Sequence, residues 1–118
     1  MLPANNRLKN KKVFNDIFRY GKTFSNDVFM MKMTTARSGD ATQFGFGVGL
    51  KFSKKATRRN KVKRWMREAV RKKIEKITPG HRVIFLANPK YPEEKLNLEI
   101  IQKNIDSLFK KAKIIQEE

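Results

Sequence analysis

The sequence lacks cysteine, contains a single histidine and has only 11 acidic residues among 118. The absence of cysteine excludes a disulfide framework and thiolate metal sites. The acids before the final segment are scattered, whereas a two-metal nuclease needs several carboxylates converging on ions about 3.5–4 Å apart. His81 follows a Pro-Gly pair and opens a predicted strand, a position that favours a structural role. No serine, threonine or lysine stands in a recognisable nucleophile setting, so we predict no catalytic residue and assign no metal ligand.

Long apolar runs are absent as well. No stretch reaches the roughly 18 apolar residues of a membrane-spanning helix, and the first residues lack the apolar middle of a secretory signal. These absences predict a cytoplasmic protein that does not act at a membrane. No internal repeat, low-complexity tract or linker divides the chain, so we predict one domain over residues 1–118. An apolar fraction of 39%, with nine phenylalanines, is sufficient for a single core.

Positive charge is abundant and unevenly distributed. The formal net charge is +17, and the segment from Lys51 to Lys76 holds 13 lysines and arginines against two glutamates, a net of +11. Within this segment we predict a basic helix over residues 53–77. Like charges four residues apart weaken an isolated helix by about 0.2–0.5 kcal/mol per pair. A row of them with almost no acid therefore predicts a surface that binds a polyanion. Nucleic acid is the usual partner of such a surface, ahead of an anionic membrane as the next candidate.

The predicted basic helix has two distinct faces. An apolar stripe at steps of three and four comprises Val62, Trp65, Met66, Ala69, Val70, Ile74 and Ile77. The candidate nucleic-acid-binding residues of the helix are Arg58, Arg59, Asn60, Lys63, Arg64, Arg67 and Arg71. Arg59, Lys63, Arg67 and Arg71 follow strict four-residue spacing, which places them on one side of the helix.

The remaining segments predict an α+β fold. Residues 1–9 are expected to form a basic arm, followed by a helix that Asn10 caps and Gly21 ends. Alternating or continuous apolar residues predict strands over 27–35, 43–50 and 81–87, with a further short strand around 22–25. A last helix is predicted over 97–113, capped by Asn97. Because residues 93–118 carry a net charge of −1, we expect this helix to be structural.

Two features allow two interpretations each. Phe14 and Phe18 lie four residues apart on the first predicted helix, where they either pack into the core or line a groove in which bases stack. Gly45, Gly47 and Gly49 share one face of a predicted strand. They indicate either the close approach of a packed helix or a bare surface on which another backbone can lie.

Arg59-Asn60, Lys63-Arg64, Arg67-Glu68 and Arg71 resemble the signature helix of the protein subunit of bacterial ribonuclease P. The segments NRLKNKKVFNDIFRYGK, FGFGVGLKFSKK and VIFLANP resemble the first helix, the strand with its basic loop, and the C-terminal third of that family. The resemblance covers nearly the whole chain.

The resemblance implies a ribonucleoprotein enzyme that removes the 5′ leader from precursor transfer RNA, in which a large RNA carries out the hydrolysis with Mg²⁺. It also implies a small sheet of about four strands packed with three helices, a left-handed βαβ crossover and one protein per catalytic RNA. The signature helix would bind the catalytic RNA. A cleft between the first helix and the sheet would bind the leader; its residues are Phe14, Phe18, Lys32, Lys51, Lys54 and Lys55.

Two positions depart from the family pattern. Lys61 stands where arginine is common, which keeps the charge and loses the bidentate geometry of arginine on phosphate. Lys32 stands where a cleft aromatic is expected. Two other functions fit a basic helix of this kind: a non-enzymatic RNA-binding protein of the ribosomal or RNA-chaperone type, and an architectural DNA-binding protein. No small-molecule cofactor is expected.

Overall fold

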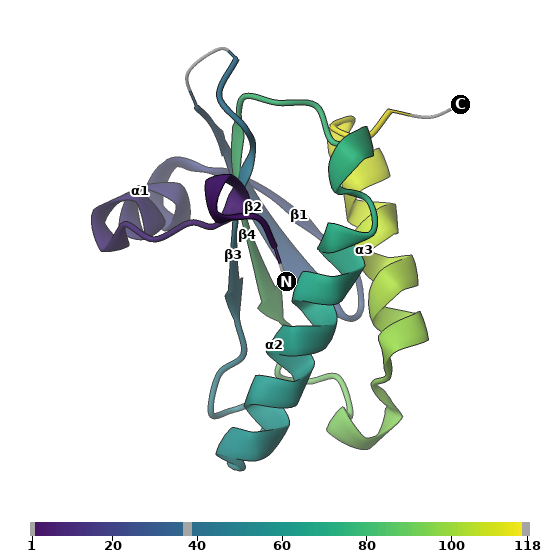
Figure 1. Cartoon of the computed structure of the whole chain (residues 1–118). Coiled ribbons are helices and arrows are strands. Elements are labelled where there is room, and N and C mark those ends of the chain that lie inside the picture. The colour runs from purple at the N-terminus through teal and green to yellow at the C-terminus, as the bar shows by residue number, and fades with distance from the viewer. Residues whose placement is uncertain (1, 37–38, 117–118) are drawn as a thin grey trace.

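A computed structural model of the chain describes residues 2–36 and 39–116. It contains three α-helices, four strands and three short 3₁₀ turns (Figure 1). The helices are α1 (Lys11–Tyr20), α2 (Ala56–Arg71) and α3 (Leu98–Ala112); the strands are β1 (Lys22–Ser25), β2 (Phe29–Thr35), β3 (Gln43–Gly47) and β4 (His81–Ala87); the 3₁₀ turns are η1 (Ala4–Asn6), η2 (Ile74–Lys76) and η3 (Glu93–Lys95).

The four strands form one mixed sheet in the order β1-β2-β4-β3. The β1–β2 and β2–β4 pairs are antiparallel, and β3 is parallel to β4. The parallel pair is connected through α2 in a left-handed crossover, which is rare. Helices α2 and α3 cover one face of the sheet, and α1 lies on the other face (Figure 1). The α+β fold predicted from the sequence is therefore confirmed.

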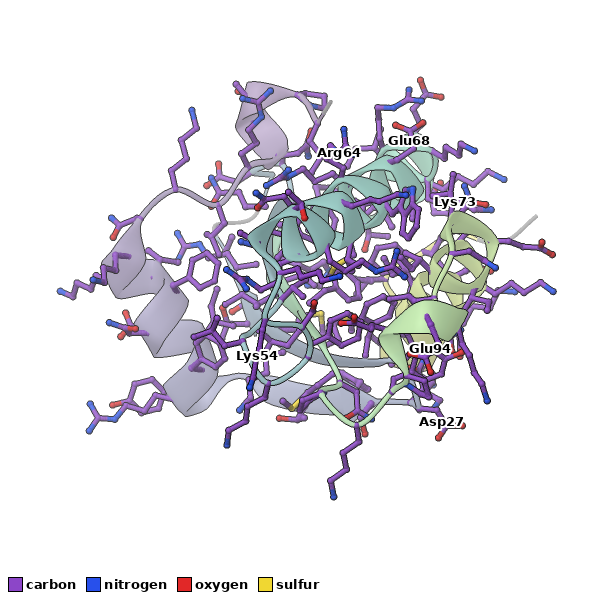
Figure 2. All side chains as sticks on the ribbon, turned by 90° about the horizontal axis from the view of Figure 1, so that it is seen from below. Asp27, Lys54, Arg64, Glu68, Lys73 and Glu94 are labelled. Carbon is purple, nitrogen blue, oxygen red and sulfur yellow. The ribbon has the colours of Figure 1, made fainter. Side chains whose placement is uncertain are left out.

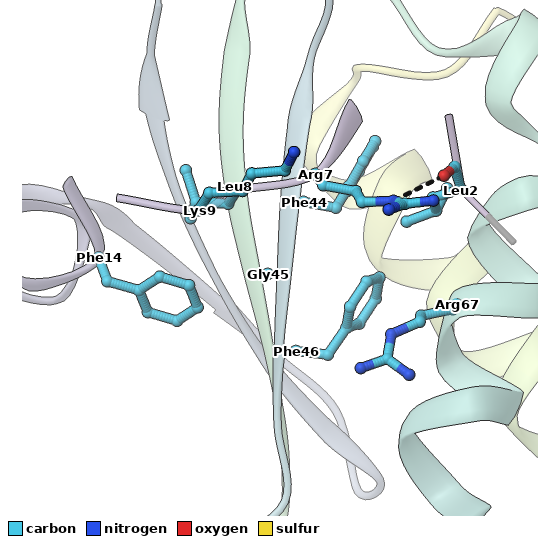
Figure 3. Close-up of a pocket in the computed structure, with 9 residues that line it drawn as sticks. All are labelled: Leu2, Arg7, Leu8, Lys9, Phe14, Phe44, Gly45, Phe46 and Arg67. Atoms are coloured by element: carbon cyan, nitrogen blue, oxygen red, sulfur yellow. Dashed lines mark hydrogen bonds between the residues drawn. The ribbon is translucent and has the colours of Figure 1, made fainter. Parts of the chain in front are cut away.

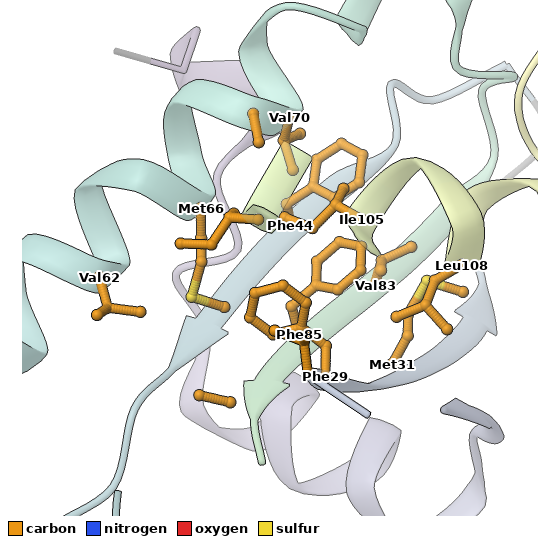
Figure 4. Close-up of a cluster of buried hydrophobic side chains, with 14 of the residues drawn as sticks. Phe29, Met31, Phe44, Val62, Met66, Val70, Val83, Phe85, Ile105 and Leu108 are labelled. Atoms are coloured by element: carbon orange, nitrogen blue, oxygen red, sulfur yellow. The ribbon is translucent and has the colours of Figure 1, made fainter. Parts of the chain in front are cut away.

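The main core lies between the sheet and the α2–α3 layer (Figure 4). Phe85 of β4 is fully buried at its centre, with edge-to-face contacts to Phe29 and Phe109. On the opposite face, Ile84 of β4 is buried and so is Ile17 of α1. The continuous apolar run of β4 is thus covered on both sides, as its sequence predicted.

The predicted helix caps are present. The side chain of Asn10 accepts hydrogen bonds from the backbone N–H groups of Lys12 and Val13, and the N–H of Gly21 donates to the carbonyl of Ile17. The side chain of Asn97 likewise accepts from the N–H of Ile100 at the start of α3. These bonds satisfy backbone groups that a helix end otherwise leaves without a partner.

Several elements are shorter than expected. Strand β2 begins at Phe29 and not at position 27, because the side chain of Asn26 holds the preceding residues in a turn. Strand β3 ends at Gly47. The N–H groups of Phe52 and Ser53 donate hydrogen bonds to the carbonyl of Gly49, so the chain forms a turn there. Helix α2 begins at Ala56 and ends at Arg71, inside the expected range of 53–77.

The first residues are docked on the sheet and do not form a free arm. Leu2 is buried, and the N–H of Leu8 donates to the carbonyl of Phe44 in β3 at 2.9 Å. The side-chain amide of Asn6 donates to the carbonyl of Thr42 at 2.8 Å. The segment predicted as a basic arm is thus docked along the edge of β3 over residues 2–9; residue 1 lies outside the described residues. In the described ranges no helix is long and apolar enough to span a membrane.

Candidate nucleic-acid interface

Helix α2 has one buried side and one cationic side. Its apolar stripe is buried at Val62, Met66, Ala69 and Val70. On the other side Asn60, Arg64 and Arg67 are exposed and Lys63 is half-buried (Figure 2, where Arg64 is labelled). The ion pairs found among the described residues are Arg71–Glu68, Lys103–Glu99 and Lys110–Asp106. We call Asn60, Lys63, Arg64 and Arg67 the α2 cationic face: a surface whose three charges have no carboxylate partner in the described chain.

Two arginines at the start of α2 are held by the protein itself. The guanidinium of Arg58 donates to the carbonyl of Glu93 and lies 5.7 Å from the ring centroid of Trp65. Arg59 donates to the carbonyl of Ser53 at 3.0 Å and is half-buried. Both side chains were predicted to contact RNA. Their hydrogen bonds give them a structural part in fixing the loops that flank α2, and their contact with RNA stays a prediction.

Arg71, at the end of α2, is paired with an acid. Its Nε and one terminal nitrogen donate to the two carboxylate oxygens of Glu68 at 3.0 and 2.5 Å. The hydrogen bond from Arg71 lowers the pKa of Glu68, and the same bond raises the pKa of Arg71. Arg71 is therefore partly neutralised, unlike the α2 cationic face beside it.

Phe14 and Phe18 have different surroundings on α1. Their ring centroids are 6.3 Å apart, and Phe18 is 39% exposed while Phe14 is half-buried. A Cβ placed on Gly45 would lie 2.4 Å from the Phe14 ring, so the absence of a side chain at Gly45 permits α1 to approach β3. Phe14 therefore packs against the sheet, whereas much of Phe18 remains free for a ligand.

Helix approach explains one glycine of the three. A Cβ on Gly47 would meet the side chain of Leu86, a neighbour in the sheet, at 2.6 Å, and a Cβ on Gly49 would have no atom within 4 Å. Of the two interpretations, close approach of a helix thus accounts for Gly45, while Gly49 lies in open space.

Lys32 lies at the end of α1. Its ammonium donates to the carbonyl of Phe18 at 3.0 Å. A cation at the C-terminal end of a helix interacts favourably with the helix dipole. Lys32 therefore stabilises α1 where the family pattern predicts an aromatic ring, and it lies beside Phe18.

The other predicted lysines are in the loop between β3 and α2. Lys51, Lys54 and Lys55 are all exposed (Figure 2, where Lys54 is labelled). The N–H of Lys55 is held by the hydroxyl of Ser53 at 3.3 Å. Their side chains form no ion pair in the described chain, so this loop extends the positive surface at the start of α2.

A pocket of about 380 Å³ lies at the outer edge of β3 (Figure 3). We call it the edge pocket; it is lined by Leu2, Arg7, Leu8, Lys9, Phe14, Phe44, Gly45, Phe46 and Arg67. Its lining includes both Phe14 and Arg67, which lie on opposite sides of β3 (Figure 3). Arg7 and Lys9 were not singled out, because a docked N-terminal segment has no signature in the sequence.

No acidic cluster suited to a metal ion is found among residues 2–36 and 39–116. His81 lies at the start of β4: its Nε2 lies 3.3 Å from the hydroxyl of Thr78, and burial lowers its pKa.

The comparisons with known proteins agree with the geometry. The family model for ribonuclease P matches residues 2–113. The ribonuclease P protein component of Synechocystis sp. is 32% identical over 97% of this chain and 90% of its own length. The ribonuclease P protein component of Fusobacterium nucleatum is 34% identical over 93% of this chain and 99% of its own length.

Solved structures show the same similarity. The ribonuclease P protein of Thermotoga maritima is 32% identical, with a TM-score of 0.79 over 89% of this chain and 96% of its own. The ribonuclease P protein of Staphylococcus aureus is 25% identical, with a TM-score of 0.82 over 94% of this chain and 98% of its own. None of these relatives favours the ribosomal or DNA-binding alternative. Since the family model spans nearly all of the sequence, the chain belongs to the ribonuclease P protein family.

Proposed function

We propose that this chain, as a ribonuclease P protein component, binds a catalytic RNA through the α2 cationic face and the 5′ leader of precursor transfer RNA beside α1. The observation that carries the proposal is the α2 cationic face itself. Lys63, Arg64 and Arg67 have no carboxylate partner among the described residues, although the helix contains Glu68. Charges kept free in this way are available to phosphate groups.

Binding to the catalytic RNA would be dominated by phosphate contacts. Each such contact releases counterions, so the logarithm of the affinity falls with the logarithm of the salt concentration by about 0.7–0.9 per contact. Folded RNA is recognised largely by its shape and backbone, which a rigid cationic helix can match. The exposed lysines Lys51, Lys54 and Lys55 would extend this surface.

The leader would bind where Phe18 is exposed. Stacking of a base on an aromatic ring contributes about 1–3 kcal/mol and tolerates any base, which suits leaders of differing sequence. The ammonium of Lys32, 3.0 Å from the backbone carbonyl of Phe18, supplies a positive charge at the same residue. Phe14 would contribute through the part of its ring that the sheet leaves uncovered.

Hydrolysis would be carried out by the RNA, with Mg²⁺ held mainly by RNA phosphates. The protein's part would be to bind the precursor and orient it on the catalytic RNA, because its cations reduce the repulsion between the two RNAs. One protein per RNA, acting in the cytoplasm, would be sufficient for this mechanism.

Reconstitution tests the proposal. Purified protein is added to a bacterial ribonuclease P RNA transcript, and cleavage of a precursor transfer RNA is measured as Mg²⁺ is lowered. We expect the protein to lower the Mg²⁺ concentration needed for half-maximal cleavage, and we expect an Arg64→Ala variant to do so less well. Cleavage that is unchanged by the protein at every Mg²⁺ concentration would refute the proposal.

A second measurement separates the proposal from the ribosomal alternative. RNA that copurifies with the protein from cells is sequenced. A single RNA of a few hundred nucleotides supports the proposal, whereas ribosomal RNA in stoichiometric amount supports a ribosomal protein.

A further inference from the structure

The last turn of α1 is bonded to the sheet through its carbonyl groups. The carbonyls at the C-terminal end of a helix have no partner within the helix. In α1 the carbonyl of Ile17 accepts a hydrogen bond from the N–H of Gly21 at 2.9 Å, and the carbonyl of Phe18 accepts one from the ammonium of Lys32 in β2 at 3.0 Å. The second bond therefore joins this turn directly to a side chain of the sheet.

Lys32 stands on the sheet face that α1 covers. It lies opposite Thr23 of β1 on one side and Ile84 of β4 on the other, and paired residues of neighbouring strands share a face. Ile84 is fully buried on the face where α1 lies (Figure 1), and Lys32 is half-buried. A lysine can bury its methylene stem while its ammonium reaches a polar group. Lys32 thus reaches the end of α1 from a base inside the sheet.

Gly21 brings the end of α1 against the same strand. A Cβ at Gly21 would lie 3.1 Å from the carbonyl oxygen and 3.3 Å from the backbone nitrogen of Met33, the residue after Lys32. The next residue along the chain, Lys22, already pairs with Met33 at the start of β1. This close approach of the two backbones places the carbonyl of Phe18 within reach of Lys32.

The ring of Phe18 depends on this turn for its position. The ring is 39% exposed, and its aromatic neighbour is Phe14 of the same helix, at 6.3 Å between centroids. A contact within one helix does not fix the ring relative to the sheet. A binding side chain that is already held in place raises affinity, because less ordering is paid for on binding.

We infer that Lys32 is a positioning residue for the leader: its ammonium holds the last turn of α1 through the carbonyl of Phe18, and so holds the Phe18 ring where a base stacks on it. The inference rests on the proposed function, which places the leader beside Phe18. It goes beyond that function because Lys32 acts through α1, and its ammonium is not a contact for a leader phosphate.

The test uses the full-length protein reconstituted with a bacterial ribonuclease P RNA. The variants are Lys32→Met, Lys32→Arg, Phe18→Ala and the double variant of Lys32→Met with Phe18→Ala. Methionine keeps an unbranched apolar stem and removes the donor, whereas arginine restores a donor. Lys22→Met is the matched control, because Lys22 is exposed and lies opposite Met33, whose side chain points to the other face of the sheet from that of Lys32. Urea unfolding confirms that each variant is folded.

Affinity for precursor transfer RNA with and without its leader is measured over a range of salt concentrations. We expect Lys32→Met to lose about fivefold in affinity for the leader-bearing precursor, the lower end of what one stacked base contributes, and to spare the leaderless transfer RNA. Its log–log salt slope should equal that of Lys22→Met, since no phosphate contact is lost. The loss should largely disappear when Phe18 is already alanine, because both changes act on one ring. Lys32→Arg should keep the affinity of the unmodified protein.

A loss that persists in the Phe18→Ala background overturns the inference. If the salt slope is also shallower than that of Lys22→Met by about 0.7, the ammonium of Lys32 binds a leader phosphate. The inference is equally overturned if Lys32→Met matches Lys22→Met, or if it weakens binding of leaderless transfer RNA to the same extent. In each of these cases Phe18→Ala still weakens leader binding. If Phe18→Ala has no effect on leader binding, the proposed leader site fails and the inference fails with it, which distinguishes the two failures.

Discussion

The guanidinium of Arg58 lies over the ring of Trp65, 5.7 Å from its centroid, and the ammonium of Lys61 lies 5.1 Å from the same centroid. Arg58 also donates a hydrogen bond to the carbonyl of Glu93, in the turn that precedes α3. A residue that was expected to face RNA thus ties α2 to a segment 35 positions away in the sequence. The α2 cationic face begins only beyond it.

Replacing Arg58 by alanine should therefore lower stability and leave the electrostatics of RNA binding unchanged. We expect the free energy of unfolding to fall by about 1–3 kcal/mol, from the loss of a charged hydrogen bond and a cation–π contact. Urea unfolding measures the change in the free energy of unfolding. The salt dependence of binding to the catalytic RNA measures the electrostatics of RNA binding. Arg64→Ala is the control: it should keep the stability and make the log–log salt slope shallower by about 0.7–0.9. A shallower slope for Arg58→Ala as well would mean that Arg58 contacts phosphate.

Phe18 and Tyr20 offer a matched pair for the leader site. Phe18 is 39% exposed and Tyr20 is 73% exposed, near the same end of α1. Phe18→Ala should weaken binding of leader-bearing precursor by about 1–3 kcal/mol, the contribution of one stacked base, and should spare binding of leaderless transfer RNA. Tyr20→Ala should change neither affinity. If Phe18→Ala instead loses about 3–5 kcal/mol of stability, the ring belongs to the core and not to the leader site.

Elements with a local signal could be predicted from the sequence. The caps at Asn10 and Asn97 depend on hydrogen bonds to residues two or three positions away, so a short window contains all the information needed. The buried side of α2 follows from a repeat of three and four residues, and β4 follows from a continuous apolar run. Both patterns report burial directly.

Features that depend on distant contacts could not be predicted in this way. Arg58 and Arg64 are both arginines of one helix. Arg58 is distinguished from the exposed Arg64 by its hydrogen bond to the carbonyl of Glu93, a contact that a local sequence window does not contain. The burial of Leu2 depends on a sheet that forms from residues far along the chain. The edge pocket has the same origin, since it joins residues 7–9 to Arg67. The left-handed crossover was nevertheless accessible, because the resemblance to a family carries long-range information that periodicity lacks.

The stability of the protein should fall as the pH is lowered below about 6.5, through His81. Burial lowers the pKa of His81 in the folded state, so between the folded value and the ordinary 6.5 the unfolded chain binds more protons. The free energy of unfolding therefore rises with pH across that window and is level above it. Urea unfolding between pH 5 and pH 8 measures the slope.

The His81→Gln variant provides the control for this slope. Glutamine can keep a hydrogen bond to the hydroxyl of Thr78 and does not titrate, so the slope above pH 5 should largely disappear. An unchanged slope in His81→Gln would assign the pH dependence to another group.

The pair formed by Glu68 and Arg71 should limit the contact of α2 with RNA. Both carboxylate oxygens of Glu68 accept from Arg71, and this bond lowers the pKa of Glu68. In Glu68→Gln the guanidinium of Arg71 becomes available to a phosphate. The salt slope for the catalytic RNA should then steepen by as much as about 0.9, and stability should change little because the pair is exposed at the surface.

A control variant with the same change in net charge separates the release of Arg71 from the effect of net charge on RNA binding. Glu75 is exposed and forms no ion pair in the described chain, so Glu75→Gln raises the net charge equally without releasing an arginine. Addition of Arg71→Ala to Glu68→Gln should return the slope to that of the unmodified protein. If Glu75→Gln steepens the slope as much as Glu68→Gln does, the gain comes from net charge, and Arg71 makes no contact of its own.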